Sequence, residues 1–284
     1  MKFVLKLRII TSVVVSLITL AILFTLAKVM SDYIYQQNLT VWINPKNRTE
    51  NYCETPLQTT HLIREPWNAY GSIFFIIPFC FVIVNTLFDF FFKTKSFLSK
   101  NQPLEIIFSI LLLFHFIGTF TNHACSCKRG LGLDNMFMWL TLFYILGLTF
   151  IINVETLRNI DKAPFYIILG IVMILAAGLF TPLAFDTLSS LGRSIISGTL
   201  FLLISIFNII FIRVNEMKIN RKNEQHNAHF WIALVMLVFG LVFALLDSKI
   251  CSMTNKFGSH SIFHILASGA LTEMYLFLHS IIRY

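Results

Sequence analysis

The chain has 284 residues, of which 56% are hydrophobic and 13% are charged, and its mean hydropathy is +0.75. Soluble globular domains carry about 25% charged residues, so this composition excludes an ordinary soluble globule. The formal net charge is +8, but the basic residues are scattered over short loops rather than gathered in a stripe with aromatic residues, so we expect no nucleic-acid partner. A multi-pass membrane protein is the class that remains.

Apolar runs long enough to cross a bilayer predict the spanning elements, because a transmembrane helix needs about 20 such residues. Eight runs qualify, at residues 9–30, 67–88, 103–122, 134–154, 163–183, 192–213, 229–247 and 260–281. None alternates with the period of a membrane β-strand. The predicted fold class is therefore an all-α polytopic membrane protein.

The first run resembles a signal sequence because it follows a basic start. Its apolar stretch, Ile9 to Ala27, exceeds the usual h-region of about 7–15 residues, and Ser31-Asp32-Tyr33 is a poor cleavage site. An uncleaved signal-anchor helix over residues 1–31 is therefore favoured over a cleaved signal peptide. A loop over 32–66 follows it.

The distribution of Lys and Arg predicts the orientation. With a cytoplasmic amino terminus, more than half of the 22 Lys and Arg residues fall inside, as the positive-inside rule requires. The loops 31–66, 123–133, 184–191 and 248–259 then lie on the non-cytosolic side.

Four ionisable residues, His123, Asp134, His260 and His264, lie at the predicted non-cytosolic ends of their helices. An Asp at the centre of a membrane helix costs about 2.5–3.5 kcal/mol, so such a group needs a partner. His260 and His264 are one helical turn apart and share a face. With His123 they would give zinc three ligands and leave one position for water, with Asp134 as a base. Taken singly, each residue is more readily explained as a polar group at the membrane interface, and only the four together favour a metal.

The cysteines fall into three sets. Cys53 and Cys251 lie on the predicted oxidising side, where a disulfide between them would hold the amino-terminal loop over the site. Cys125 and Cys127 are interpreted as free or bonded elsewhere, with a zinc-thiolate role as the alternative. Cys80 is interpreted as a small packing residue.

Other polar residues in the apolar runs have weaker interpretations. Asp247 is favoured as a structural hydrogen-bond partner rather than a catalyst. Glu273 has no assigned role, and pairing with His115 or contact with a lipid headgroup are open alternatives. His226 and His229 are expected to be solvated in a cytoplasmic loop.

Several short motifs together resemble the alkaline ceramidases, seven-helix zinc amidases of the endoplasmic reticulum, Golgi and plasma membrane within the CREST superfamily. The motifs are Tyr52-Cys53-Glu54, Ile63-Arg64-Glu65-Pro66-Trp67-Asn68, Gly118-Thr119-Phe120-Thr121-Asn122-His123, Asp134, Asp247 to Cys251, and His260-Ser261-Ile262-Phe263-His264. The resemblance begins at about residue 50. It implies a seven-helix catalytic bundle over 67–284, with the first helix as an addition.

The resemblance also implies roles for individual residues. His123, His260 and His264 would hold zinc, and Asp134 would orient and deprotonate the attacking water. Thr119 stands at a position that is serine in the family, where its hydroxyl would donate to the oxyanion.

The family also binds calcium near its amino terminus, and Glu54 and Glu65 match its acidic ligands. Asn51 replaces an Asp, Tyr52 replaces a Trp, and Pro56 replaces an Asn. A hard cation needs several oxygen ligands, so the resemblance implies calcium less strongly than zinc.

The function so implied is hydrolysis of the linear amide C–N bond of ceramide-like lipids to a sphingoid base and a fatty acid. The lipid would enter from the bilayer, in the endoplasmic reticulum or Golgi if the source is eukaryotic. The alternative within the superfamily is an adiponectin-receptor-like or haemolysin-like protein with a mainly structural zinc. A transporter predicts internal repeats and midplane polar sites, and the sequence shows no repeat.

Overall fold

The structure is a computed structural model that describes residues 2–37, 57, 61–92, 97–158, 197, 199–210, 212, 224–247, 249–250 and 259–280. Within these ranges every regular element is a helix, which confirms the predicted all-α class for this part of the chain. The main elements are α1 (Lys2–Gln36), α2 (Pro66–Ile73), α3 (Ile76–Phe92), α4 (Phe97–Lys100), α5 (Gln102–Cys125), α6 (Lys128–Arg158), α9 (Glu224–Leu245) and α11 (His260–Ser280).

Six stretches among the described residues are long and apolar enough to cross a membrane, which indicates a multi-pass membrane protein. They are Lys6–Gln36, Pro66–Phe92, Gln102–Cys125, Gly130–Ile151, Asn227–Leu245 and His260–Ser280. They correspond to the first four and the last two predicted runs. The sixth predicted run, 192–213, contains the shorter apolar helix Thr199–Ile210, and the fifth, 163–183, lies outside the described residues.

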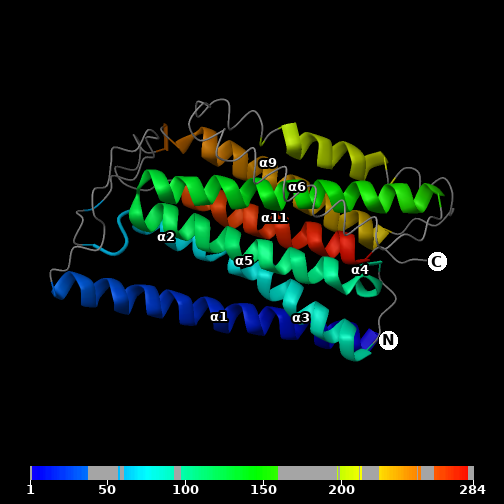
Figure 1. Ribbon diagram of the computed structural model, residues 1–284, viewed down its shortest axis with the longest axis horizontal. Coiled ribbons are helices and arrows are strands. Elements are labelled where there is room, and N and C mark those ends of the chain that lie inside the picture. Colours follow the sequence, from blue (N-terminus) through cyan, green and yellow to red (C-terminus); the bar gives the residue numbers. More distant parts are fainter. Residues whose placement is uncertain are drawn as a thin grey trace.

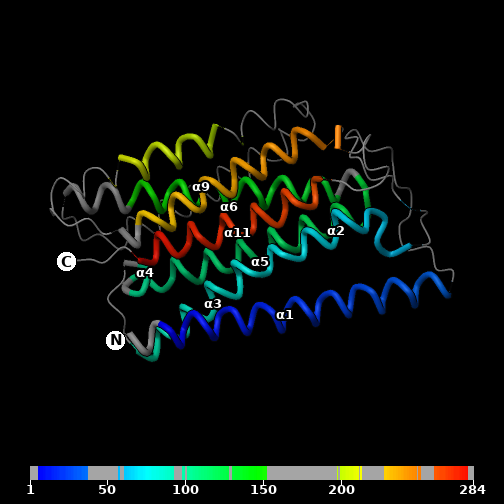
Figure 2. Tube along the Cα trace, turned by 180° about the vertical axis from the view of Figure 1, so that it is seen from behind, coloured from blue at the N-terminus to red at the C-terminus, as the bar shows by residue number. Residues whose placement is uncertain are grey.

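The helices lie side by side with roughly aligned axes (Figure 1). α11 contacts α9 on one side and α2 and α3 on the other, so it runs through the middle of the bundle. α5 packs against α6, α3 and α2. Seen from behind, α1 runs along one edge of the bundle (Figure 2), where it contacts only α2 and α3 to any extent among the described elements.

Two apolar cores hold this arrangement together. The larger core joins α3, α5, α6, α9 and α11 and includes the fully buried side chains of Phe108, Tyr275 and Phe277. The smaller core joins α1 to α2 and α3 through Leu20 and Ala27. Most of the remaining α1 surface is apolar and exposed, as expected for a helix that faces lipid.

Close contact between α2 and α11 depends on one glycine. A Cβ added to Gly71 would lie 2.9 Å from the Ser261 carbonyl oxygen and 3.0 Å from its Cα. Small residues allow membrane helices to approach closely and pack by van der Waals contact. Gly71 therefore brings the start of α11, where His260 and His264 lie, against the start of α2.

Candidate metal centre

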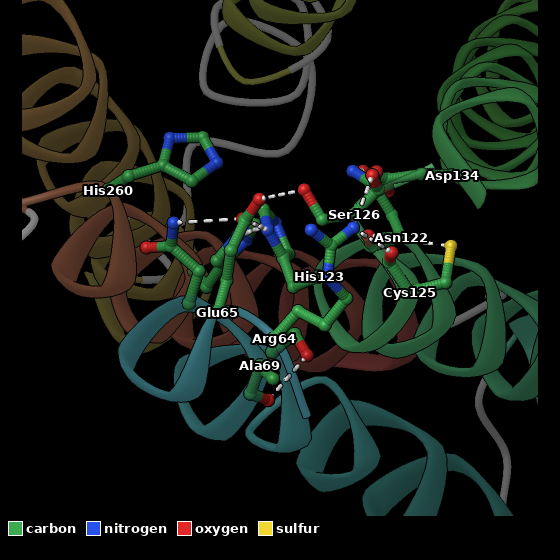
Figure 3. Close-up of polar contacts among 12 residues, drawn as sticks. Arg64, Glu65, Ala69, Asn122, His123, Cys125, Ser126, Asp134 and His260 are labelled. Carbon is green, nitrogen blue, oxygen red and sulfur yellow. Dashed lines mark hydrogen bonds and ion pairs between the residues drawn. The ribbon is translucent and has the colours of Figure 1, made fainter. Parts of the chain in front are cut away.

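Three imidazoles lie close together, and we call His123, His260 and His264 the histidine cluster. Figure 3 shows His123 and His260 with the polar residues around them. His260 and His264 occupy successive turns at the start of α11, and His123 occupies the last turn of α5. His123 is fully buried and His264 nearly so, while His260 is partly exposed. Two helices that are distant in sequence therefore place three metal-type ligands together.

The geometry of the histidine cluster fits a tetrahedral metal. Zn–N bonds of about 2.0–2.1 Å place two coordinating nitrogens about 3.3 Å apart. The Nε2 atoms of His123 and His264 are 2.9 Å apart, and one ligand nitrogen from each ring lies within 4.8 Å of the other two. Three imidazoles are a donor set that suits zinc and other transition metals.

Glu65 fixes the orientation of His123. Its Oε2 lies 2.8 Å from His123 Nδ1, and its Oε1 accepts a 2.7 Å hydrogen bond from Ser126 Oγ. Asn68 Nδ2 adds a longer bond of 3.4 Å to Oε2. A carboxylate on Nδ1 directs the lone pair of Nε2 outward, an arrangement found behind most histidine ligands of metals. Nε2 of His123 is thereby turned toward His264, where it could serve as a metal ligand.

Glu65 was predicted as a calcium ligand, and that role stays a prediction. In the structure both of its carboxylate oxygens make contacts next to the histidine cluster. The other three candidate calcium residues, Asn51, Tyr52 and Glu54, lie outside the described residues. The contact with His123 was missed from sequence. Its one local signal is the acidic residue directly before Pro66, which begins α2.

Main-chain pairing holds Glu65 at this place. Arg64 N donates to Ala124 O over 3.0 Å, and Glu65 N donates to His123 O over 3.2 Å. Arg64 Nη1 also donates to Cys125 O over 3.1 Å. The last carbonyls of a helix have no partner within the helix, so the segment before α2 satisfies the end of α5 and carries Glu65 to His123.

Asp134 lies on the first turns of α6, beside the end of α5. Its Oδ1 accepts a 2.6 Å bond from Thr119 Oγ1, and its Oδ2 accepts a 2.7 Å bond from Asn122 Nδ2. Thr119 and Asn122 stand one turn and one residue before His123, so Asp134 is held beside the helical turn that carries this ligand. Sequence reasoning missed the role of Asn122.

The hydroxyl of Thr119 donates to Asp134 in the structure. Its donation to a substrate oxyanion, as the resemblance implies, stays a prediction. A hydroxyl has one proton to donate. Thr119 is therefore placed to orient the carboxylate.

The interpretation of Cys125 and Cys127 as free or bonded elsewhere is wrong, because the two form a disulfide with each other. α5 ends at Cys125 and α6 begins at Lys128, so the tight turn between the helices brings the two sulfurs together. Cys53 and Cys251, the predicted disulfide pair, lie outside the described residues. Cys80 is a free, buried cysteine packed against α1, in agreement with its predicted packing role.

Asp247 supports the start of α11. Its Oδ1 accepts bonds from His260 N over 3.0 Å and from Ser259 Oγ over 3.1 Å. Unpaired N–H groups at a helix start are commonly satisfied by carboxylates in this way. The predicted structural role of Asp247 is consistent with this contact, which fixes the first turn of the helix that carries two of the three histidines.

A second buried group lies at the opposite ends of α5 and α11. We call Asp89, Glu105 and His279 the carboxylate cluster, and their ligand atoms also lie within 4.8 Å of one another. His279 Nε2 is 2.6 Å from Asp89 Oδ2 and 3.5 Å from Glu105 Oε1. Arg8 Nη1 is 3.1 Å from Asp89 Oδ1, and Tyr275 donates its hydroxyl to Glu105 over 3.0 Å. The sequence reasoning did not identify this group.

The partner of Glu273 is His229, whose Nδ1 lies 2.6 Å from Glu273 Oε2. His229 was expected to be solvated in a loop, and this was wrong because α9 begins earlier, at Glu224. His115, the other suggested partner, is buried and stacks on Phe75 with ring centroids 4.5 Å apart. The Glu273 pair joins α9 to α11, away from both clusters.

No protein-family model matches the chain, and no curated protein matches its sequence.

Proposed function

We propose that the chain is a zinc-dependent membrane amidase that hydrolyses the amide bond of ceramide-like lipids. One observation carries the proposal: three imidazoles converge, and Asp134 is hydrogen-bonded to Thr119 and Asn122, which lie within one turn of His123, in a helical protein whose spans suit a bilayer. The motif resemblance to alkaline ceramidases supports amide hydrolysis over other reactions that such a site performs.

The side chains divide the work by position. His123, His260 and His264 would hold the metal, with Glu65 fixing the ring of His123. When bound, zinc would polarise the amide carbonyl and acidify a water molecule. Asp134 would accept the proton of the attacking water and deliver it to the leaving amine as the C–N bond breaks. Thr119 and Asn122 would keep both oxygens of Asp134 in place during this transfer.

The proposal also includes the side of the membrane to which the site faces. With the amino terminus in the cytoplasm, the histidine cluster would lie toward the non-cytosolic side, and the lipid would reach it sideways from the bilayer. The products would be a sphingoid base and a free fatty acid. Calcium near the amino-terminal loop remains an expectation from the resemblance alone.

Asp134→Asn tests the chemistry. An amide cannot accept the proton, so we expect kcat for ceramide hydrolysis to fall about 10²- to 10⁴-fold, with zinc content unchanged. Thr119→Ser is the matched control, because it keeps the hydroxyl that bonds Asp134 and should keep activity. The measurement is release of sphingoid base from labelled ceramides by the purified protein, with metal content determined on the same samples.

Two results would count against the proposal. Near-normal turnover in Asp134→Asn would remove Asp134 from the chemistry. Zinc bound at full occupancy without turnover of any ceramide or related lipid amide would favour the structural zinc of a receptor-like protein.

A further inference from the structure

A three-residue turn, Cys125-Ser126-Cys127, joins α5 to α6 directly behind the histidine cluster. The disulfide between Cys125 and Cys127 spans Ser126, which has φ 46° and is the only described non-glycine residue with a positive φ. An L-residue adopts this left-handed conformation reluctantly. Ser126 is nevertheless buried and ends α5 through a 2.8 Å bond from its N–H to Asn122 O.

The turn aims the Ser126 side chain at the support of a candidate metal ligand (Figure 3). Ser126 Oγ donates to Glu65 Oε1 over 2.7 Å, and Glu65 Oε2 holds His123 Nδ1 at 2.8 Å. Disulfide, hydroxyl, carboxylate and imidazole therefore form one continuous chain of contacts. Loss of the hydroxyl would leave Oε1 of a buried carboxylate without this donor and free Glu65 to rotate away from His123.

The surroundings leave the turn little freedom. Arg64 Nη1 lies 3.1 Å from Cys125 O and 3.5 Å from Ser126 O, so it contacts the same carbonyls that the turn presents. A Cβ on Gly130 would lie 2.6 Å from Cys125 Sγ, so the disulfide packs against the bare backbone of α6. Only a glycine at position 130 permits this approach. The contacts of Arg64 and Gly130 are therefore formed around the disulfide-bonded turn.

We propose that the Cys125–Cys127 disulfide and Ser126 act as a redox-sensitive clamp that sets the metal affinity of the histidine cluster. Ser126 is a positioning residue, since it acts on His123 through Glu65. This inference rests on the proposed metal site. It adds a regulatory input at a turn that the predicted topology exposes to the non-cytosolic side.

Opening the clamp is a balanced exchange with a dithiol. One thiolate of the dithiol attacks Cys127 Sγ, because Cys127 is partly exposed whereas Cys125 is fully buried. The Cys125 sulfur leaves and takes up a proton, and a mixed disulfide forms at Cys127. The second thiol of the reductant then displaces Cys127, so the dithiol ends as a disulfide and the protein gains two electrons and two protons. Ser126 is then released from its left-handed turn.

The expected size of the effect follows from comparable supports of metal-binding histidines, whose removal weakens metal binding about 10- to 100-fold. We expect a Zn²⁺ dissociation constant that is higher by that factor after reduction. The Co²⁺-substituted protein should also change its visible absorption, because the ring of His123 reorients. Neither readout depends on catalytic activity.

The test uses full-length protein in detergent, titrated with Zn²⁺ or Co²⁺ against a chelator before and after treatment with a phosphine reductant. The phosphine takes up oxygen from water as it breaks the S–S bond, and it avoids the zinc binding of dithiols. Ser126→Gly keeps the left-handed turn but removes the hydroxyl, so it should weaken Zn²⁺ binding about 10- to 100-fold even when oxidised. The double variant Cys125→Ala/Cys127→Ala should bind weakly and ignore the reductant.

The outcomes separate the two proposals. If reduction of wild type and Ser126→Gly both leave Zn²⁺ affinity unchanged, the clamp is overturned while the metal site stands. If oxidised wild type binds neither Zn²⁺ nor Co²⁺, the metal site itself is overturned and the clamp falls with it. A reductant response that persists in Cys125→Ala/Cys127→Ala would assign the redox effect to another disulfide and overturn the role of this one.

Discussion

The two buried clusters at the opposite ends of α5 and α11 have similar residue types but different ways of balancing charge. The histidine cluster gathers three imidazoles, and its nearest carboxylate, Glu65, contacts His123 from behind. The carboxylate cluster gathers two acids and one imidazole, and Arg8 from α1 already forms an ion pair with Asp89. Among the described contacts, the carboxylate cluster therefore includes a cation, Arg8.

This difference decides which cluster we propose as a metal site. The Nε2 atoms of His123 and His264 lie 2.9 Å apart, close enough to share a proton or to approach one metal ion, and three imidazoles are a ligand set that zinc accepts. In the carboxylate cluster the guanidinium of Arg8 and the imidazole of His279 occupy the two oxygens of Asp89. Ligand-type residues at short distances therefore do not define a metal site until their existing cations are counted.

The distance between the clusters matches the membrane. His123 and Glu105 are eighteen residues apart on α5, which corresponds to about 27 Å along the helix. The hydrocarbon core is about 30 Å thick. In a bilayer of this thickness the clusters would fall near the two interfaces, where polar groups cost less than at the bilayer centre. The histidine cluster would suit a site reached from one side of the membrane. The carboxylate cluster would suit holding the opposite ends of the helices together.

The largest expected effect is a difference in zinc content between variants of the two clusters. His264→Ala removes one of three ligands and should reduce bound zinc from about one equivalent per chain to near zero. Asp89→Asn, the matched change in the carboxylate cluster, should leave zinc content unchanged. Elemental analysis of the purified variants checks both, and zinc lost in Asp89→Asn but kept in His264→Ala would reverse our assignment.

The free energy of unfolding, unlike the zinc content, should fall when the carboxylate cluster is changed. Asp89→Asn leaves Arg8 and His279 beside a neutral amide in a buried place, which we expect to cost about 3 kcal/mol of the free energy of unfolding. Adding Arg8→Met should recover part of that loss, because no uncompensated charge then remains. Unfolding of the single and double variants in detergent measures this coupling, and simple additivity would mean that the pair contributes nothing.

A smaller effect is expected where the histidine cluster depends on a helix end. Asp247→Ala removes the acceptor for His260 N and Ser259 Oγ and should cost about 1 kcal/mol, as for other helix caps. Zinc binding should weaken less than tenfold, because both histidines stay on α11. Asp247→Asn keeps an acceptor oxygen and should be nearly silent. A zinc loss as complete as in His264→Ala would make Asp247 a ligand instead of a cap.

The sequence was informative wherever one helix was sufficient for the argument. Long apolar runs predicted the six stretches of spanning character seen among the described residues. The one-turn spacing of His260 and His264 predicted a shared face. Hydropathy gives no signal where a helix continues beyond its apolar run. The start of α9 at Glu224 and the position of His229 within this helix were therefore missed.

Contacts between distant segments were beyond sequence reasoning. The acidic residue before Pro66 marks Glu65, but it does not reveal that Glu65 reaches His123 across fifty-eight positions. No local pattern indicates that Asp89, Glu105 and His279 meet. These contacts depend on which helix faces pack together, and apolar composition reports only compatibility with lipid. The turn at Ser126 was missed for a related reason, since a Cys-x-Cys spacing allows a free or a bonded pair, and the helix ends decide which one forms.

The smallest expected effect tests whether burial or distance governs these pairs. His229–Glu273 and His279–Asp89 have the same separation of 2.6 Å, but the side chains are 36% and 24% exposed in the first pair and 5% and 0% in the second. Partly exposed ion pairs contribute about 0–1 kcal/mol, because the surroundings also stabilise the separated groups. Glu273→Gln keeps a hydrogen-bonding oxygen and should change the free energy of unfolding by less than about 0.5 kcal/mol, with zinc content and turnover unchanged. Unfolding measured beside Asp89→Asn gives the contrast directly. An equal loss in both variants would show that distance, not burial, sets the strength of these pairs, and a loss of zinc in Glu273→Gln would connect this helix contact to the histidine cluster.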